Sequence, residues 1–219
     1  MGLLHGLRDP DSGYSIAKRL RSRRFELFEG LIAALPRPVR ILDVGGTQDF
    51  WETMDFVDPA SCRITVLNLE APQPRHENIA TVAGDACRMD FGDAEFDVVF
   101  SNSVIEHVGA DDRQDAMASE VRRVGKRYFV QTPNLYFPIE PHFMFPFFQF
   151  LPLSTRGFLL QHLKLSWGGR IRDPETARAA AAGVRLVGLS RFRALFPDAR
   201  IHRERILGLT KSFIAYGGW

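Results

Sequence analysis

The sequence predicts an α/β domain built on a doubly wound, mainly parallel β-sheet. Short runs rich in Val, Ile and Phe alternate with helical segments, which is the pattern of strands joined by crossover helices. Several runs are apolar throughout, as expected for strands that helices cover on both faces. A chain of 219 residues, 45% hydrophobic and 25% charged, suits a single domain. The predicted strands are Val39–Val44, Arg63–Leu69, Ile79–Ala83, Phe96–Ser101 and Arg127–Thr132.

The first 38 residues precede this alternation. Residues 1–13 carry Gly, Asp and Pro without a sustained period, which indicates a loosely structured lead-in. Apolar residues three and four apart predict an amphipathic helix over Tyr14–Leu35, which Pro36 ends because proline lacks an N–H. We interpret its basic run, Arg19–Arg24, as a solvated face, with an acidic partner or a membrane surface as the alternative.

The remaining segments complete the α/β pattern around one irregular stretch. Residues 134–170 interrupt the alternation and are predicted to form an insertion or lid within the domain. Asp173, Pro174 and Glu175 have the cap, first-turn proline and acid of a helix start. The further expected elements are helices at Gln48–Phe56, Asp111–Val124, Asp173–Gly183 and Arg191–Phe196, and a closing hairpin of Ala199–Leu207 and Lys211–Tyr216.

Charge and cysteine content narrow the classes of function. The 28 Lys and Arg residues against 26 Asp and Glu residues give a net charge of +2. This balance does not favour a protein whose affinity rests on many phosphate contacts, so no nucleic-acid partner is expected. The start of the sequence shows no signal-peptide pattern. The two cysteines, Cys62 and Cys87, are therefore interpreted as reduced thiols of a cytoplasmic protein.

The first predicted strand runs directly into two glycines. Gly45 and Gly46 lie at the edge where open α/β sheets bind ligands, although the full G-x-G-x-x-G motif is missing. Asp43, two residues earlier, would repel a pyrophosphate and attract a positively charged ligand such as S-adenosylmethionine. The pattern therefore disfavours a nicotinamide-dependent oxidoreductase. An ordinary strand-to-helix turn is the structural alternative for the glycines alone.

The next three predicted strands also end in small or polar residues. After the second strand, Asn68 and Glu70 can hydrogen-bond ribose hydroxyls, and Leu69 can pack on a purine. After the third strand, Asp85 can accept a hydrogen bond from an adenine amino group, with Ala86 beside it. The fourth strand ends in Ser101 and Asn102.

Five segments, in this order, resemble class I S-adenosylmethionine-dependent methyltransferases. The resemblance is specific over about residues 39–135 and points particularly to the small-molecule branch that includes ubiquinone and menaquinone biosynthesis enzymes. It implies a Rossmann-like seven-stranded sheet of order 3-2-1-4-5-7-6 with an antiparallel last strand, and S-adenosylmethionine over strands one to four. The segments are ILDVGG, the spaced Asn68 and Glu70, GDA, FDVVFSNSVIEHV and YFVQTPN.

The resemblance also implies roles for individual residues. Asp43, Gly45 and Gly46 look like the loop at the methionine end of the cofactor. The ribose contact falls to Asn68 or to Glu70, two alternatives that the sequence leaves open. The remaining implied contacts are those of Asp85 and the Ala86 backbone with adenine, and of Ser101 and Asn102 with the methyl group.

Methyl transfer from a sulfonium needs orientation more than a dedicated nucleophile, because the leaving group is already activated. An oxygen acceptor would gain from a general base, and His107 and His142 are the candidates. A structural role in which His107 hydrogen-bonds backbone is the alternative. His142 follows the fifth strand and would overhang the acceptor side, with Glu140 as its partner.

The sequence indicates no metal site. Certain ubiquinone-type O-methyltransferases carry an acid three residues before the Glu106-His107 pair and are associated with a divalent metal. Ser103 occupies that position in this chain. Two ligands are too few for a metal site, so no metal site is predicted.

Phenylalanine is concentrated in the insertion. Its most aromatic part, residues 143–153, is only 11 residues long and falls short of the roughly 18–20 needed to cross a bilayer. Three interpretations stay open: a lid over an apolar acceptor pocket, a shallow membrane contact, or packing against the sheet or a second subunit in a homodimer. The seven phenylalanines of this cluster, among 18 in the chain, are Phe137, Phe143, Phe145, Phe147, Phe148, Phe150 and Phe158.

The sequence thus predicts an S-adenosylmethionine-dependent methyltransferase that acts on a small apolar, aromatic or lipid-like acceptor by in-line displacement. Its predicted location is the cytoplasm or the periphery of a membrane. A non-catalytic interaction module of the same fold is the alternative.

Overall fold

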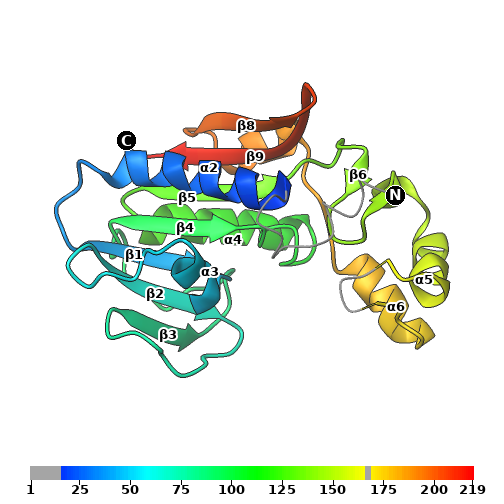
Figure 1. Ribbon diagram of the computed structural model, residues 1–219, viewed down its shortest axis with the longest axis horizontal. Coiled ribbons are helices and arrows are strands. Elements are labelled where there is room, and N and C mark those ends of the chain that lie inside the picture. The colour runs from blue at the N-terminus through cyan, green and yellow to red at the C-terminus, as the bar shows by residue number, and fades with distance from the viewer. Residues whose placement is uncertain (1–15, 166–168) are drawn as a thin grey trace.

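A seven-stranded sheet forms the centre of the computed structural model, which describes residues 16–165 and 169–219 (Figure 1). The expected lead-in, residues 1–13, lies outside the described residues. The strand order is β3-β2-β1-β4-β5-β9-β8, and β9 runs antiparallel to both neighbours, which confirms the predicted order. The strands are β1 (Val39–Val44), β2 (Cys62–Asn68), β3 (Ile79–Ala83), β4 (Val98–Asn102), β5 (Tyr128–Pro133), β8 (Arg200–Ile206) and β9 (Leu209–Gly217).

Helices cover both faces of this sheet, so successive strand residues enter two different apolar clusters. Ile41 lies in the cluster beneath α2 (Ile16–Ile32) and α3 (Gln48–Thr53). Leu42, the next residue, lies in the cluster beneath α4 (Asp111–Val124) and α7 (Leu189–Leu195). Burial on both faces explains why these strands are apolar throughout.

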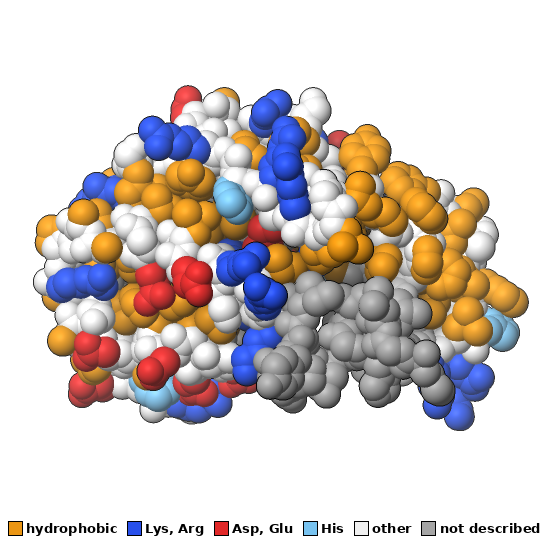
Figure 2. All heavy atoms as spheres, turned by 45° about the horizontal axis from the view of Figure 1, so that its top comes forward, with side chains coloured by type: hydrophobic (Ala, Val, Ile, Leu, Met, Phe, Trp, Pro, Cys, Tyr) orange, Lys and Arg blue, Asp and Glu red, His pale blue; other side chains and the backbone are white. Residues whose placement is uncertain are grey.

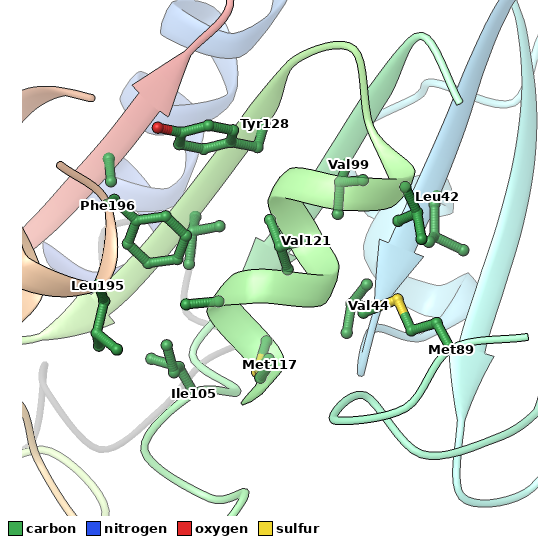
Figure 3. Packing of buried hydrophobic residues seen from close by; sticks show 14 of the residues in the cluster. Leu42, Val44, Met89, Val99, Ile105, Met117, Val121, Tyr128, Leu195 and Phe196 are labelled. Carbon is green, nitrogen blue, oxygen red and sulfur yellow. The ribbon is translucent and has the colours of Figure 1, made fainter. Parts of the chain in front are cut away.

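The cluster under α4 is the larger of the two (Figure 3). Met117 and Val121 project from one side of the helix toward Leu42 and Val99 of the sheet. Their spacing of four residues puts them on one face of the helix, which is what the sequence period predicts.

A tight turn joins the last two strands. Leu207 and Gly208 both have positive φ angles, 49° and 82°. A two-residue hairpin turn that matches the strand twist needs positive φ at both central positions, and glycine tolerates this conformation best. The predicted hairpin is confirmed, with boundaries that differ by one or two residues.

The insertion after β5 forms a small lobe at one end of the sheet (Figure 1). Its buried residues make an apolar cluster of their own together with α6, and the Asp173 side chain caps that helix by accepting a hydrogen bond from the Thr176 N–H at 2.7 Å. The lobe comprises β6 (Ile139–Glu140), β7 (Phe145–Pro146), the 3-10 helix η1 (Phe148–Phe150), α5 (Leu153–His162) and α6 (Pro174–Ala182).

Arg24 is buried, which corrects the interpretation of the whole Arg19–Arg24 run as a solvated face. Its side chain is 8% exposed and donates to both carboxylate oxygens of Glu204 on β8, at 3.0 and 2.6 Å. Ser212 of β9 also donates to Glu204. The ion pair therefore fixes α2 to the β8–β9 hairpin.

We predict that Glu204→Gln lowers the free energy of unfolding by about 3–5 kcal/mol, because Arg24 then stays buried without a countercharge. Urea denaturation at neutral pH measures the change. Asp93→Asn is the matched control, since it removes a partner of Arg123 whose side chain is 81% exposed, and it should cost less than about 1 kcal/mol. A cost for Glu204→Gln no larger than the control's would contradict the prediction.

Candidate active site

Two cavities meet at Gly45, at the carboxyl ends of the central strands. The first, about 290 Å³, lies between the β1 loop and α3, and Arg21 of α2 also borders it. The second, about 270 Å³, lies over the ends of β2 and β3. Predicted site residues that border the first are Asp43, Gly45, Gly46 and Asn102; those that border the second are Gly45, Asn68, Leu69, Asp85, Ala86 and His107.

Asp43 is a fully buried carboxylate in the wall of the first cavity. Its Oδ2 accepts a hydrogen bond from the Trp51 indole N–H at 2.7 Å, whereas its Oδ1 has no partner among the described residues. Burial raises the pKa of Asp43 to about 7, and the Trp51 hydrogen bond offsets only part of this rise. The site therefore holds a carboxylate whose charge the protein leaves largely uncompensated.

The two glycines are required by their surroundings. A Cβ on Gly46 would lie 1.8 Å from Asp43 Oδ2, and a Cβ on Gly45 would lie 2.5 Å from a methyl group of Val104. Gly45 also has a φ of +75°, which favours glycine. The absence of both side chains lets the loop fold directly over the carboxylate.

Asn68 links the loops after β1 and β2. Its Nδ2 donates to the Gly46 carbonyl at 3.1 Å, and its Oδ1 accepts from the Leu69 N–H at 2.8 Å. Both ends of the side-chain amide thus have partners within the protein. Glu70 and Leu69 are exposed and border a separate hollow beside Asn68. The choice between Asn68 and Glu70 as the ribose contact stays a prediction.

Arg113 holds Asp85 in place, which the sequence did not indicate. The guanidinium of Arg113 donates to both Asp85 oxygens at 2.9 and 3.0 Å, and the Cys87 N–H donates to Oδ1 at 2.9 Å. The Cys87 hydrogen bond and the Arg113 guanidinium hold the pKa of Asp85 below its usual value, against the opposing effect of partial burial. Asp85 is an oriented carboxylate at the edge of the second cavity.

Ser101 and Asn102 take different places at the end of β4. Ser101 is fully buried, and its hydroxyl donates to the Val44 carbonyl at 3.1 Å. Asn102 borders the first cavity, and its side-chain oxygen accepts a hydrogen bond from Arg24. Ser101 thus supports the β1 loop and borders neither cavity, whereas Asn102 borders the first. Contact of Asn102 with the methyl group stays a prediction.

The fold brings both candidate bases together. His107 Nε2 lies 3.0 Å from His142 Nε2, and His142 Nδ1 lies 2.6 Å from Glu140 Oε1, as the sequence predicted for that partner. Burial lowers the pKa of His142, but the hydrogen bond and charge of Glu140, with the charge of Glu106, outweigh it and raise the pKa overall. Burial and the neighbouring His142 lower the pKa of His107.

Lys211 is a further basic group that sequence reasoning missed. Burial, and to a lesser extent the charge of Arg24, lower its pKa to about 8, despite the attraction of Glu204. Its charge also acts on His142. A lysine in a terminal strand gives no signal of this position, because the long-range pairing of β9 with β5 brings its charge within range of His142.

The phenylalanine cluster divides between the lobe's core and its surface. Phe143 and Phe148 are buried, while Phe147, Phe150 and Phe158 are more than half exposed. Hydrophobic side chains gather over the lobe at the right of Figure 2. Within residues 16–165 and 169–219, no helix is long and apolar enough to cross a membrane.

Residues 48–128 match the methyltransferase domain family. Two curated relatives, the uncharacterized proteins MT1557 and Rv1509 of Mycobacterium tuberculosis strains CDC 1551 and H37Rv, are 30% identical over 146 residues. The match covers 65% of this chain and 46% of each relative, so the chain spans about half the length of the curated relatives it matches.

Solved structures with similar folds include the following three. The PH0226 protein of Pyrococcus horikoshii has a TM-score of 0.55 and 16% identity, covering 93% of this chain and 91% of that one. A SAM-dependent methyltransferase of Methanosarcina mazei has a TM-score of 0.50 and 15% identity, covering 85% and 94%. Phosphoethanolamine N-methyltransferase 2 of Haemonchus contortus, in complex with S-adenosyl-L-methionine, has a TM-score of 0.52 and 14% identity, covering 83% and 38%.

The chain therefore has the Rossmann-like fold of class I S-adenosylmethionine-dependent methyltransferases. The strand order, the antiparallel β9 and the domain match over residues 48–128 agree on this assignment. The buried Asp43 carboxylate, with one oxygen unpaired in the described part of the chain, would fit a cation in the first cavity; its contact with the cofactor stays a prediction.

We predict that Asp43→Asn flattens part of the pH dependence of stability. In the unfolded chain Asp43 loses its proton near 3.8, whereas the folded chain keeps it until about 7, so the folded state binds more protons in between. Stability of the natural chain therefore falls with rising pH over this window, and the variant gains up to about 1.4 kcal/mol per pH unit relative to it.

Urea denaturation of both proteins at pH 5 and pH 7.5 measures this difference, and the contributions of all other groups cancel. Asparagine keeps an acceptor for Trp51, so that contact is preserved. A constant difference between the two proteins across this range would show that Asp43 has an ordinary pKa.

Proposed function

We propose that this protein is an S-adenosylmethionine-dependent methyltransferase whose acceptor is a small apolar, aromatic or lipid-like molecule. The observation that carries the proposal is the pair of cavities joined at Gly45, with the buried Asp43 in one wall and the oriented Asp85 in the other. The fold and the domain match over residues 48–128 support it.

The charges of the crevice suit this cofactor. The uncompensated Asp43 carboxylate favours a ligand with an ammonium and a sulfonium group over a nucleotide pyrophosphate. At the other cavity, Asp85 offers an acceptor to an adenine amino group, and the exposed Leu69 offers an apolar surface. Asn68 keeps the two loops at a fixed separation.

The bound cofactor supplies a methyl group on a positively charged sulfur. In the in-line displacement, the acceptor atom forms a bond to the methyl carbon while the carbon–sulfur bond breaks and its electron pair stays on sulfur. The chain's own task is to align the two reactants and exclude water. In this proposal Asn102, fixed by Arg24, would contact the methyl end of the cofactor, and the His142–Glu140 pair would lie on the acceptor side.

The support for an apolar acceptor comes from the surface of the lobe. Its surface carries exposed Tyr136, Phe147, Phe150, Phe158 and Leu163, and patches of this kind mark contacts with apolar partners. A molecule held in or near such a surface would be delivered to the crevice from the β6–β7 side. The near-neutral net charge of the chain fits this acceptor better than a polyanion.

We predict that calorimetry at pH 8 detects S-adenosylmethionine binding to the natural chain. Asp43→Asn should weaken it by roughly 10–100-fold, the value of a hydrogen bond to a charged group. Gly46→Ala should abolish binding, because its Cβ would collide with Asp43. Asp49→Asn is the matched control, a carboxylate that borders the same cavity but is exposed and paired with Arg75.

Methyl transfer is then measured as S-adenosylhomocysteine release with a panel of phenols, fatty acids and quinols. An intact protein that does not bind the cofactor would refute the proposed function. Cofactor binding without transfer to any acceptor class would instead favour the non-catalytic interaction module.

We also propose that the exposed face of the lobe contacts an anionic lipid surface. Residues 141–172 contain four Lys and Arg and no Asp or Glu, so the aromatic side chains stand in a positively charged setting. Aromatic rings next to basic groups are typical of shallow membrane binding, where rings enter the headgroup region and cations meet the lipid charge.

We predict that the chain cosediments with vesicles containing phosphatidylserine and binds them more tightly than vesicles of phosphatidylcholine alone. Phe147→Ser and Phe158→Ser should each weaken binding by about tenfold. Trp219→Ser, at the opposite end of the sheet, is the control and should leave binding unchanged (Figure 1). A dimer in gel filtration that Phe147→Ser dissociates would assign this face to a second copy of the chain instead.

A further inference from the structure

Three ligand groups converge beside the second cavity. Glu106 and His107 follow β4, and His142 lies on the lobe between β6 and β7. One carboxylate oxygen and one nitrogen from each ring all lie within 4.8 Å of one another. We propose that Glu106, His107 and His142 form a binding site for a divalent transition-metal ion such as Zn²⁺.

The distances between the three groups are close to those of a metal site. His142 Nε2 lies 3.0 Å from His107 Nε2 and 3.9 Å from Glu106 Oε1. Two ligand atoms that each lie about 2.1 Å from a tetrahedral ion are about 3.4 Å apart. The two separations fall on either side of this value.

Each ligand is oriented by a partner behind it. His142 Nδ1 lies 2.6 Å from Glu140 Oε1, so Nδ1 carries the proton and Nε2 presents its lone pair to the centre. Thr132 donates to Glu106 Oε2 at 3.0 Å, which leaves Oε1 to face the histidines. The Gly183 backbone hydrogen-bonds the His107 ring. Such supporting groups are a regular part of protein metal sites.

The unpaired Glu106 Oε1 is a second observation that points to a cation ligand. The Glu106 side chain is fully buried, and no residue in the described part of the chain hydrogen-bonds Oε1. A buried carboxylate oxygen without a partner is costly. A shared proton between the two imidazoles satisfies the rings but leaves this oxygen unpaired, whereas an ion at the centre satisfies all three groups.

The lobe supplies the third ligand, which the sequence indicated as a candidate base and not as a metal ligand. The β6–β7 hairpin holds His142 in place, because the Met144 N–H donates to the Glu140 carbonyl at 2.8 Å and the Phe143 N–H donates to Glu140 Oε2 at 2.7 Å. The expectation of no metal counted only Glu106 and His107. His142 is 35 residues further along the chain, and only the fold brings it to the other two.

Two protein imidazoles and one carboxylate leave one open position on a four-coordinate ion. His107 is exposed and borders the cavity that Gly45 and Asp85 also line, so this position would face the crevice. An acceptor hydroxyl bound there would lose its proton to solvent more readily, since a bound divalent ion lowers the pKa of coordinated oxygen. This role rests on the proposed methyl transfer, whereas ion binding does not.

The test is direct titration of chelator-treated protein with Zn²⁺ in calorimetry, without cofactor or acceptor. One ion per chain is expected. Glu106→Gln and His142→Ala should each weaken binding by more than about 100-fold, and Glu140→Gln, which only orients His142, by roughly 10–100-fold. His76→Gln is the matched control, because His76 also pairs with a carboxylate, Glu52, and should leave binding unchanged.

Co²⁺ gives a second readout, since a tetrahedral site of this kind produces visible absorption that the Glu106→Gln variant should lose. Absence of Zn²⁺ binding by the folded natural chain, or binding that survives both Glu106→Gln and His142→Ala, would overturn the proposal. Calorimetry with S-adenosylmethionine on the same samples separates this outcome from a failure of the proposed function.

Discussion

The burial of Asp43 beneath the β1 loop constrains the rest of the site. The carboxylate is fully buried at the end of a central strand, and the loop can pass over it only because Gly46 has no Cβ. Gly45 adds the left-handed turn that redirects the chain past Val104 toward α3. A buried carboxylate with one unpaired oxygen is unfavourable in the free protein. A cation bound in the first cavity would remove this cost.

The N-terminal helix makes the second connection on which the site depends. Arg24 of α2 joins Glu204 of β8 and Asn102 of β4 in one network, so a single side chain links the sheet's last strands to the wall of the first cavity. A buried pair of this kind adds little net stability, but it fixes relative positions because any displacement leaves a charge unpaired. The position of Asn102 therefore depends on the correct docking of α2 and the β8–β9 hairpin.

Local patterns predicted most of the fold because apolar period and turn chemistry act over a few residues. Strands at Val39–Val44 and Ile79–Ala83, and the capped helix after Asp173, occur as expected. The sheet order came from resemblance. What the sequence could not predict depends on long-range contacts. Arg24 and Glu204 are separated by 180 residues in the sequence, and His107 and His142 by 35. Burial of Arg24 could not be inferred from a run of arginines in which Arg19 and Arg23 are exposed.

Asp43 and Glu106 are two buried carboxylates with the same physical property. Burial raises the pKa of Asp43 and of Glu106 to about 7, and each keeps one oxygen without a partner within residues 16–165 and 169–219. Each is therefore a latent negative charge that costs stability when ionised in the free protein. A cation bound at either place removes that cost, so binding energy and folding energy are linked there.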